Sequence, residues 1–431
     1  DVVLPLGTVT IQETRAPRGY LVTDTSLHLQ RVTSSGTLET VEAFVAPAVA
    51  DEVVRGGVSV PKIDHELEEG VAQGDATLAG AVISIVNASA APVLVNGTEH
   101  APGEEVMTIV TGADGTASTG ADALPYGTYR LGEKSAPEGY RLNATWSVTV
   151  SVQQDGQVVQ AQTLADEVVR GAAQVAKADA DLGESSAQGD ATLSGAEISI
   201  YNRSESAVLV NGVLYQPGDV VARIVTDASG QAATEPRALP FGTYQARETA
   251  SPAGYLVNEG WSQTFQIRED GAVTDLTADK DAVDDQVVRG DLSFTKAEEG
   301  TQHRMASVAF RLTSQTTGEW HLLVSDENGM LDTSASWNSR ESGVNESDAA
   351  LREDGTVDET LLRAASGIWF SGRTDAQTSP ADNLGALPYD TYLLEELPCA
   401  ANEGHRLVST LVTISRDGVN LDLGTLDDET L

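Results

Sequence analysis

Three lysines stand where their amines could take part in chemistry. The 431-residue chain holds 26 basic residues, and only five of them are lysine, at positions 62, 134, 177, 280 and 296. Lys62, Lys177 and Lys296 each follow the glycine of a repeated Val-Val-Arg-Gly phrase by six residues. An amine becomes a nucleophile when it loses its proton, whereas an arginine guanidinium stays charged. Lysine at these positions of an arginine-rich chain therefore indicates a chemical role.

A glutamate and an aspartate recur with each lysine. Glu133, Glu248 and Glu396 each stand four residues after the tyrosine of a Thr-Tyr pair. Asp166 and Asp285 open the phrases that contain Val-Val-Arg-Gly, and Asp428 lies in the last run of the sequence. Burial disfavours the charged form of both an amine and a carboxyl, so a buried pair can be neutral. The amine can then attack the carboxyl carbon, water leaves, and the adjacent glutamate moves the protons.

The pattern predicts one cross-link in each complete repeat. The predicted isopeptide pairs are Lys62–Asp166, Lys177–Asp285 and Lys296–Asp428, promoted by Glu133, Glu248 and Glu396. The residue pattern alone also fits buried ion pairs, and the lysine usage favours the covalent bond because only lysine can form this amide. The chemistry needs no cofactor or metal, and we expect none. Apart from this reaction on itself, the chain is not predicted to be an enzyme.

Strand alternation would carry these groups into a core. Successive side chains of a strand point to opposite faces, so residues i, i+2 and i+4 share one face. Each charged residue continues an apolar face, as in Val58-Val60-Lys62, Tyr129-Leu131-Glu133 and Leu164-Asp166-Val168. A buried charge is costly unless it is paired, so the repetition of this arrangement indicates a purpose.

The same phrases divide the chain into repeats of domain size. The three lysines are 115 and 119 residues apart, which is far longer than a solenoid repeat. We predict four segments: 1–55, the late half of a domain; 56–170; 171–289; and 290–431, with an insertion at about 332–385. These ranges are called segments 1 to 4.

Turn signals separate short apolar runs within each segment. Asp114-Gly115, Ser229-Gly230 and Asn328-Gly329 supply the positive φ angles of tight hairpins,. Similar pairs precede the last run of each segment, and helical periodicity is weak. We therefore predict an all-β fold in which tandem, immunoglobulin-like β-sandwich domains are arranged as beads on a string.

Composition excludes several functional classes. The formal net charge is −39, and so acidic a chain repels nucleic acid and anionic lipid. No run of 18 apolar residues exists, so no membrane insertion is expected in this part of the protein,. Cys399 is the sole cysteine, which rules out a disulfide within the chain,. Asp1 opens directly into strand-like sequence, and we expect a longer precursor with its signal peptide and anchor outside this chain.

The order of these residues resembles a known family. The phrase around Glu133, Gly-Thr-Tyr-x-x-x-Glu-x-x-Ala-Pro-x-Gly-Tyr, lies between an early lysine and a late aspartate. This resembles collagen-adhesin B-type (CnaB) domains, also called prealbumin-like or SpaA-type pilin domains, of Gram-positive surface proteins. The resemblance implies a transthyretin-like sandwich, isopeptide bonds that the domain forms itself with the glutamate as catalyst, and an extracellular place in cell-wall-anchored adhesins or pili.

Two segments depart from that pattern. In segment 4 the phrase after Glu396 has changed to Leu397-Pro398-Cys399, and Glu395 is a second candidate that alternation disfavours. Segment 1 has Glu13 and Asp51 as an unpaired half-site, because no lysine precedes Lys62. We expect its lysine strand to lie before Asp1. Without it, segment 1 should have no isopeptide bond, an unpaired strand edge and an uncovered apolar face, which invite strand addition.

Three functions remain open. A structural stalk of an adhesin or pilin-like protein is favoured by the repeated lysine, glutamate and aspartate. The second is a ligand-binding module for a glycan or host matrix protein, which would use the insertion at 332–385 with Trp337, Trp369 and Phe370, since loops on rigid sandwiches often carry recognition. The third is an accessory region of a secreted enzyme. Other parts of the same surface protein are further expected partners.

Two motif-like stretches have plainer interpretations. Arg289-Gly290-Asp291 spells an integrin-binding tripeptide, but its sister seams read Arg-Gly-Gly and Arg-Gly-Ala, so we interpret it as a linker. Asp179, Asp181 and Glu184 lack the spacing of an EF-hand loop and are expected to form a solvated acidic turn.

Overall fold

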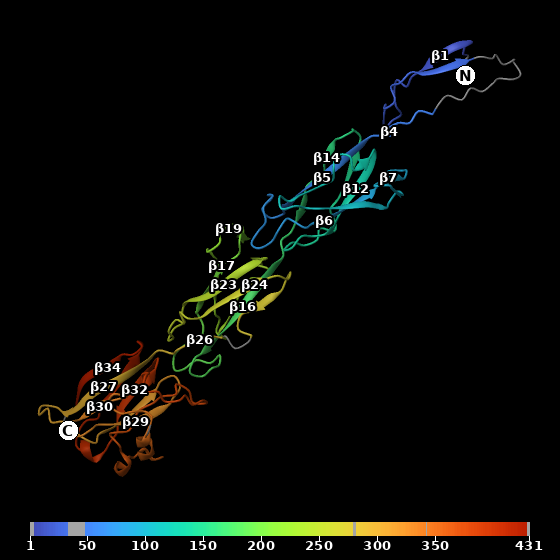
Figure 1. The fold of residues 1–431 in the computed structure, drawn as a ribbon. Helices are drawn as coiled ribbons and strands as arrows, with labels where there is room; N and C mark the ends of the chain where they lie inside the picture. The colour runs from blue at the N-terminus through green and yellow to red at the C-terminus, as the bar shows by residue number, and fades with distance from the viewer. Residues whose placement is uncertain (1–3, 33–47, 279–281, 342, 429–431) are drawn as a thin grey trace.

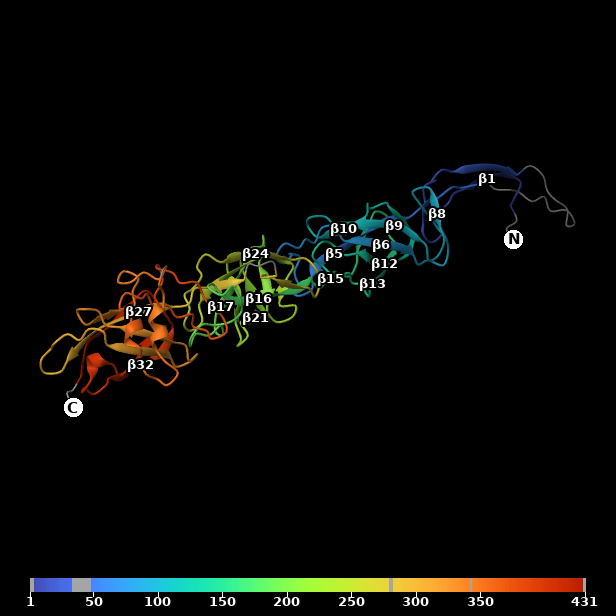
Figure 2. The ribbon, with the colours of Figure 1, turned by 90° about the horizontal axis from the view of Figure 1, so that it is seen from below.

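The chain forms a row of β-sandwiches placed end to end. A computed structural model describes residues 4–32, 48–278, 282–341 and 343–428. Figures 1 and 2 show segments 1 to 4 following one another along an extended rod, with segments 1 and 4 at opposite ends. The regular structure in the described ranges is almost entirely β, with short 3₁₀ turns in segment 4. The predicted all-β fold is confirmed.

Segment 2 consists of two sheets packed face to face, and one of these sheets is built on a single long strand. That strand is β5 (Arg55–Asp64), which carries Lys62. It pairs with the short strands β10 (Thr116–Ser118), β11 (Leu124–Pro125), β14 (Val158–Gln160) and β15 (Leu164–Asp166). The facing sheet has the order β13 (Ser147–Val152), β12 (Gly127–Ser135), β6 (Val82–Asn87) and β9 (Glu105–Val110). A hairpin of β7 (Val93–Val95) and β8 (Thr98–His100) lies beside them.

Segment 3 repeats this plan. Its long strand is β16 (Arg170–Asp179), paired with β21 (Gln231–Ala233), β22 (Leu239–Pro240), β25 (Val273–Asp275) and β26 (Val283–Asp285). The facing sheet is β20 (Val220–Val225), β17 (Glu197–Asn202), β23 (Gly242–Ala250) and β24 (Ser262–Ile267). The hairpin is β18 (Val208–Val210) with β19 (Val213–Tyr215).

Segment 4 keeps the two sheets and adds the insertion. Its long strand β27 (Arg289–Glu298) pairs with β30 (Met330–Asp332), β31 (Leu387–Pro388) and β34 (Asn420–Asp428). The facing sheet is β29 (Trp320–Val324), β28 (Ala309–Ser314), β32 (Asp390–Glu396) and β33 (Ser409–Ile414). Three 3₁₀ turns lie outside them, η1 (Glu346–Ala350), η2 (Glu359–Leu361) and η3 (Ala400–Asn402).

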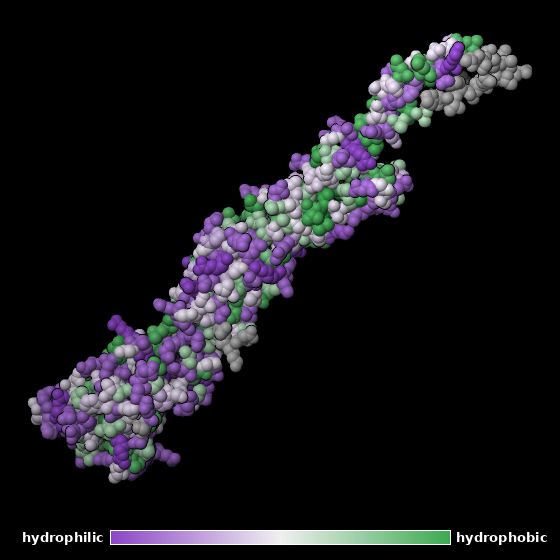
Figure 3. Space-filling view, viewed as in Figure 1, coloured by the Kyte–Doolittle hydropathy of each residue, from purple (hydrophilic) through white to green (hydrophobic). Residues whose placement is uncertain are grey.

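The insertion of segment 4 has both a core of its own and a share of the main core. Ala350 packs with Leu351, Val357 and Leu362 over Ala309 and Leu322 of the sheet. Phe370 is fully buried and joins the main core, whereas Trp337 is 42% exposed. The surface of segments 3 and 4 seen in Figure 3 is mainly hydrophilic. In the described ranges, helices are too short or too polar to cross a membrane.

An aromatic side chain lies at each junction between consecutive segments, which we call a seam. Tyr126, Phe241 and Tyr389 follow the short Leu-Pro strands, and each ring lies against the segment before it. A β-carbon built on the facing glycine, Gly19, Gly139 or Gly254, would come within 2.8 to 2.9 Å of these rings. The ring of Phe241 packs with Leu78, Tyr140 and Val168, and that of Tyr389 with Leu193, Tyr255 and Val287. Because the same contact recurs at each seam, neighbouring segments meet in one repeated arrangement.

Segment 1 is built differently in its described part. Strand β1 (Gly7–Ile11) pairs with β3 (His28–Val32), and β2 (Tyr20–Leu21) pairs with β4 (Glu52–Val53). Leu6 and Leu29 are 62% and 72% exposed. These two small sheets form no closed sandwich among the described residues, in agreement with the predicted uncovered apolar face.

Candidate cross-link sites

The site of segment 2 lies between two parallel strands. The register of β15 on β5 pairs Leu164 with Lys62, which sets Asp166 beside Asp64. Lys62 Nζ lies 3.1 Å from Asp166 Oδ2, and neither side chain is exposed to solvent. Glu133 reaches the same place from β12 in the facing sheet, and the backbone N–H of Asn143 donates to Glu133 Oε2 at 2.7 Å. The predicted lysine, glutamate and aspartate of this segment are therefore brought together.

Burial moves the protonation of this site toward neutral groups. Desolvation lowers the pKa of the Lys62 amine, although Asp166 and Glu133 oppose the shift. Desolvation also raises the pKa of Glu133 to about 7, with the neighbouring Asp166 adding to the rise. A low dielectric disfavours charge on the Lys62 amine and on the Glu133 carboxyl, and a neutral amine is one condition of the predicted reaction.

The site of segment 3 is a closer version of the same arrangement. Lys177 Nζ lies 2.5 Å from Asp285 Oδ1 and 2.8 Å from Glu248 Oε1, with all three side chains inaccessible to solvent. The register of β26 on β16 again pairs the aspartate two residues beyond the lysine. Desolvation raises the pKa of Asp285 to about 7, Lys177 opposes the rise, and Glu248 adds to it. One lysine thus touches both of its predicted partners.

The site of segment 4 is described in part. Lys296 Nζ lies 3.4 Å from Glu396 Oε2, and both side chains are buried. The side chain of Asp428 lies outside the described residues, but its backbone pairs with Glu298, two residues after Lys296, as in the other segments. Glu396 accepts from Asn402 Nδ2 at 2.9 Å and from the Val408 N–H at 3.0 Å. Glu395 instead binds Arg311 near the surface, so the glutamate that alternation favoured is the one beside Lys296.

Segment 1 brings its half-site together as well. Burial raises the pKa of Glu13, and the adjacent Asp51 raises it further. Glu13 Oε2 and Asp51 Oδ1 are enclosed oxygens that accept no hydrogen bond from the described residues. The sequence supplies no lysine before position 62, so two carboxyls face each other in this segment.

The acceptor carboxylates have unusual hydrogen bonding. Both oxygens of Asp166 and both of Asp285 are enclosed, and no described group donates them a hydrogen bond of ordinary geometry. Each carboxyl is instead in ion-pair contact with its lysine: Lys62 Nζ lies 3.1 Å from Asp166 Oδ2, and Lys177 Nζ lies 2.5 Å from Asp285 Oδ1.

A second buried carboxylate beside each lysine escaped prediction. Asp64 and Asp179, two residues after Lys62 and Lys177, are fully buried. Tyr140 Oη donates to Asp64 at 2.8 Å, and Tyr255 Oη donates to Asp179 at 2.7 Å. The expectation of a solvated turn at 179–184 is therefore wrong for Asp179, because tyrosine and Gln188 enclose it. Burial raises the pKa of Asp179, and these hydrogen bonds oppose the shift.

The missed residues do have a sequence signal. The phrase Ala-Gln-Gly-Asp-Ala-Thr-Leu occurs at 72–78 and again at 187–193. Its glutamines, Gln73 and Gln188, donate to Asp64 and Asp179 at 3.0 to 3.2 Å. Repetition at the same distance from each lysine could have marked this phrase as part of the site.

The altered phrase of segment 4 is an insertion rather than a loss. Glu403-Gly404-His405-Arg406-Leu407 corresponds to Glu138-Gly139-Tyr140-Arg141-Leu142. Gly404 has φ 82° and Gly139 has φ 86°, a conformation that favours glycine,. The residue that follows each stretch donates its N–H to the buried glutamate. The predicted change at Leu397-Pro398-Cys399 is corrected accordingly: extra residues at 3₁₀ turn η3 precede a preserved turn, in which His405 replaces tyrosine.

The integrin-like tripeptide is not displayed. Arg289 is fully buried and stacks on Trp369, with the guanidinium carbon 3.9 Å from the ring centroid. Asp291 Oδ1 accepts from Arg340 Nη2 at 2.7 Å. Both charged groups therefore hold segment 4 together, and the tripeptide opens strand β27 instead of forming the linker that the sequence suggested.

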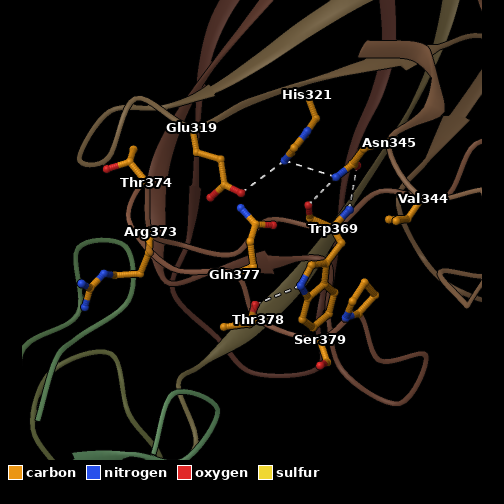
Figure 4. A pocket seen from close by; sticks show the side chains of 11 residues that line it. Glu319, His321, Val344, Asn345, Trp369, Arg373, Thr374, Gln377, Thr378 and Ser379 are labelled. Carbon is orange, nitrogen blue, oxygen red and sulfur yellow. Dashed lines mark hydrogen bonds and ion pairs between the residues drawn. The ribbon is translucent and has the colours of Figure 1, made fainter. Parts of the chain in front are cut away.

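The insertion also borders a cavity of about 570 Å³, shown in Figure 4. Glu319, His321 and Asn345 point toward one another on its wall. Burial lowers the pKa of His321, but hydrogen bonds to Asp348 and Glu319 outweigh it and raise the pKa overall. Glu319 also accepts the N–H groups of Ser371 and Gly372. These polar groups bond mainly to each other, so the cavity does not by itself favour the ligand-binding alternative.

Solved structures of similar shape come from Gram-positive bacteria. The Bacillus anthracis TIE protein is 19% identical, with a TM-score of 0.53 over 94% of this chain and 55% of that one. The major pilin subunit BcpA of Bacillus cereus is 14% identical, with a TM-score of 0.28 over 88% of this chain and 100% of that one. At 19% identity the likeness to the TIE protein concerns the fold alone, and the chain spans 55% of that protein's length. No curated protein matches the chain.

A family model supports the same assignment. The model of the SpaA prealbumin-like fold domain matches residues 58–165 and 181–282. Each match runs between the two strands that bear a lysine and an aspartate of one segment. The resemblance inferred from the sequence is confirmed for these two stretches: segments 2 and 3 each contain a domain that matches the SpaA prealbumin-like fold domain.

Proposed function

We propose that this chain is a stalk segment of an adhesin or pilus-like surface protein, held by self-formed Lys–Asp isopeptide bonds. The observation that carries the proposal is the enclosed contact of Lys177 with both Asp285 and Glu248. Its counterpart in segment 2 has the same strand register. An enclosed amine that faces an enclosed carboxyl beside a proton-transfer group is the arrangement needed for amide formation.

The reaction balances without a cofactor. The neutral Lys177 amine attacks Cγ of the protonated Asp285 carboxyl, and Glu248 accepts a proton from the amine nitrogen. Glu248 then returns that proton to the departing hydroxyl, so one water leaves for each amide formed. Glu133 and Glu396 have the same role at Lys62 and Lys296. The chain acts on itself once, and we propose no external substrate.

The position of the bond supports a mechanical role. In segment 2, tension that enters β5 at Arg55 would pass along the strand to Lys62, cross the amide to Asp166, and leave through the next seam. The two sheets between these residues would carry little load. The amide would close a loop of about 100 residues, and a disulfide that closes a loop of this length stabilises a domain by about 4–5 kcal/mol.

We also propose where this protein is located and which partners it has. A segment of this kind would stand outside the cell on a wall-anchored protein, with other parts of the same protein, and a host matrix protein or glycan, as its partners. The domain boundaries at 55, 170 and 289 belong to the proposal too.

Mass spectrometry of the intact, denatured chain tests the bonds. Each amide lowers the mass by one water, so we expect a deficit of three waters. Lys62→Arg should restore one water. Lys134→Arg is the matched control, because Lys134 is 56% exposed and pairs with Glu105, and its deficit should stay at three. A wild-type chain with the full sequence mass would overturn the proposed bonds.

A further inference from the structure

We propose that docking of the following segment positions the cross-link site of the segment before it, through Gln73 in segment 2 and Gln188 in segment 3. This inference rests on the proposed isopeptide function. Neither glutamine touches the reacting atoms, so each is a positioning residue. The inference follows from two chains of contacts: one runs from a seam to Lys62, and a similar one runs from the next seam to Asp179, two residues after Lys177.

In segment 2 the contacts begin on segment 3. The backbone N–H of Leu209 donates to Gln73 Oε1 at 2.9 Å. Gln73 Nε2 donates to both oxygens of Asp64, at 3.2 and 3.1 Å, and to Glu66 at 2.9 Å. Asp64 in turn accepts from Tyr140 Oη. The Tyr140 ring lies under Lys62, with Nζ 4.7 Å from its centroid.

An arginine at the seam also binds Glu66, the second carboxylate that Gln73 contacts. Arg170, which starts the long strand of segment 3, donates from Nε and Nη2 to the two oxygens of Glu66. Glu66 therefore connects Gln73 to the seam by a second route. Both routes are part-buried or buried, where hydrogen bonds fix geometry more firmly than at the surface.

Segment 3 repeats the arrangement with different donors. Arg289 lies at the boundary of segments 3 and 4, as the first residue of β27, and its Nη2 donates to Gln188 Oε1 at 3.0 Å, in the place that the Leu209 N–H takes in segment 2. Gln188 Nε2 donates to Asp179 and to Asp181. Tyr255 completes the link to Asp179. Since the donors differ and the glutamine contacts persist, the two copies support a role for the glutamine rather than a by-product of one seam.

Segment 4 has a different connection at this place. Only residues 299–308 join β27 to β28, whereas residues 65–81 join β5 to β6. The Gln-Gly-Asp phrase is absent from the shorter connection, Glu298 replaces the aspartate, and His405 replaces the tyrosine. The glutamine link thus accompanies the segments whose far end is covered by another described segment.

The loop that holds Gln73 is in close contact with segment 3, so segment 3 can fix where this loop lies. A β-carbon on Gly74, next to Gln73, would lie 2.2 Å from the carbonyl oxygen of Phe241. The Gly74 N–H donates to Ala207 O at 3.0 Å, and Asp75 N–H donates to Phe241 O at 3.2 Å. The loop that holds Gln73 is therefore fixed by segment 3 on both sides. Without that contact, the tyrosine wall beside Lys62 would lose its support.

The test follows bond formation in each segment of the full chain by peptide mass after refolding. Gln73→Ala should slow the Lys62–Asp166 bond by roughly ten- to a hundredfold, the usual effect of a small misplacement of reacting groups. The Lys177–Asp285 bond in the same molecules is the internal control and should keep its rate. Gln188→Ala should give the reverse. Phe241→Ala removes the aromatic ring at the seam but keeps glutamine at position 73. It should loosen the contact between the segments and so also slow the formation of the segment 2 bond.

A conservative variant separates positioning from loss of structure. In Gln73→Glu a carboxylate would face Asp64 and Glu66, with Arg170 behind Glu66 and Tyr140 behind Asp64. At neutral pH this repulsion should slow the segment 2 bond. At acidic pH the protonated side chain offers one donor and one acceptor again, so the ratio of segment 2 to segment 3 rates should rise. The ratio for Gln73→Ala should stay flat with pH.

The outcomes distinguish the two proposals. A wild-type chain without cross-links would overturn the proposed function, and the inference with it. A cross-linked wild type, with unchanged segment 2 rates in both Gln73→Ala and Phe241→Ala, would overturn the inference alone. Should Gln73→Ala prevent folding of segment 2, the decision rests on Phe241→Ala, whose change lies in segment 3.

Discussion

Phe241 of segment 3 lies directly against Gly139 of segment 2: a β-carbon at position 139 would come within 2.9 Å of Phe241 Cδ1. The same pairing joins Tyr126 to Gly19 and Tyr389 to Gly254. Glycine is required at 139 for a second reason, because its φ of 86° strains other residues,. One aromatic ring and one glycine thus set how consecutive segments meet.

Gly139→Ala should bend or loosen the rod at the second seam. The added methyl group would meet both Phe241 and Ala76, so the contact must open. Small-angle X-ray scattering should show a shorter maximum dimension or a wider range of shapes. Gly404→Ala is the matched control, since Gly404 has φ 82° and no described atom within 4 Å of the added carbon. Equal scattering from both variants would count against the seam contact.

Glu248→Gln should leave segment 3 without its bond. The amide side chain keeps the shape of glutamate but cannot accept and return a proton, so cross-linking should slow by about a hundredfold or more. Peptide mass mapping should find free Lys177 and Asp285 peptides, with the segment 2 link intact. Glu197→Gln, at a side chain 36% exposed on the neighbouring strand, is the control. A normal Lys177–Asp285 link in Glu248→Gln would show that this glutamate does not catalyse.

The unlinked form of segment 2 should lose stability as the pH rises. In Lys62→Met no bond can form, and Glu133 stays buried with Asp166. Desolvation raises the pKa of Glu133 in the folded chain from 4.5 to about 7. A carboxyl with a raised folded pKa stabilises fully below its unfolded pKa and loses that contribution as the pH rises through the folded value. Urea unfolding should therefore show falling stability of this segment between about pH 4.5 and 7.

The control for that titration is the double variant Lys62→Met with Glu133→Gln. It also lacks the bond, but it has no carboxyl to titrate at position 133. Its stability should change little over the same pH range. A flat pH profile for Lys62→Met would mean that Glu133 is not held in a desolvated place.

Alternation predicted the groups that lie within one strand. Val58, Val60 and Lys62 share a buried face because side chains on a strand must alternate,. Glu396, rather than Glu395, lies beside Lys296 for the same reason. Such inferences need only local geometry, so they hold wherever the strand itself was recognised.

Contacts between segments could not be predicted in this way. Gln73 matters because Leu209, 136 residues later, donates to it, and no local pattern reports such a distance. Asp179 appeared to be a surface residue because its acidic neighbours suggested a solvated turn, whereas Tyr255 encloses it from 76 residues away. The Gly404 turn was missed because an insertion shifted it along the sequence. Each of these residues depends on long-range packing.

Segment 1 should be the first part of the chain to be cleaved by protease. A chain that begins at Asp1 has no lysine before position 62 to join Asp51. Its described strands leave Leu6 and Leu29 exposed, and few buried contacts mean a low free energy of local opening. Brief trypsin treatment should therefore cut after Arg15, Arg18 or Arg31 while segments 2 to 4 stay whole. Gels and peptide masses would record the rate of cleavage in each segment. Equal rates in segments 1 and 3 would contradict both the low stability of segment 1 and the protection of segment 3 by its bond. In Lys177→Arg, segment 3 alone should become sensitive at higher temperature.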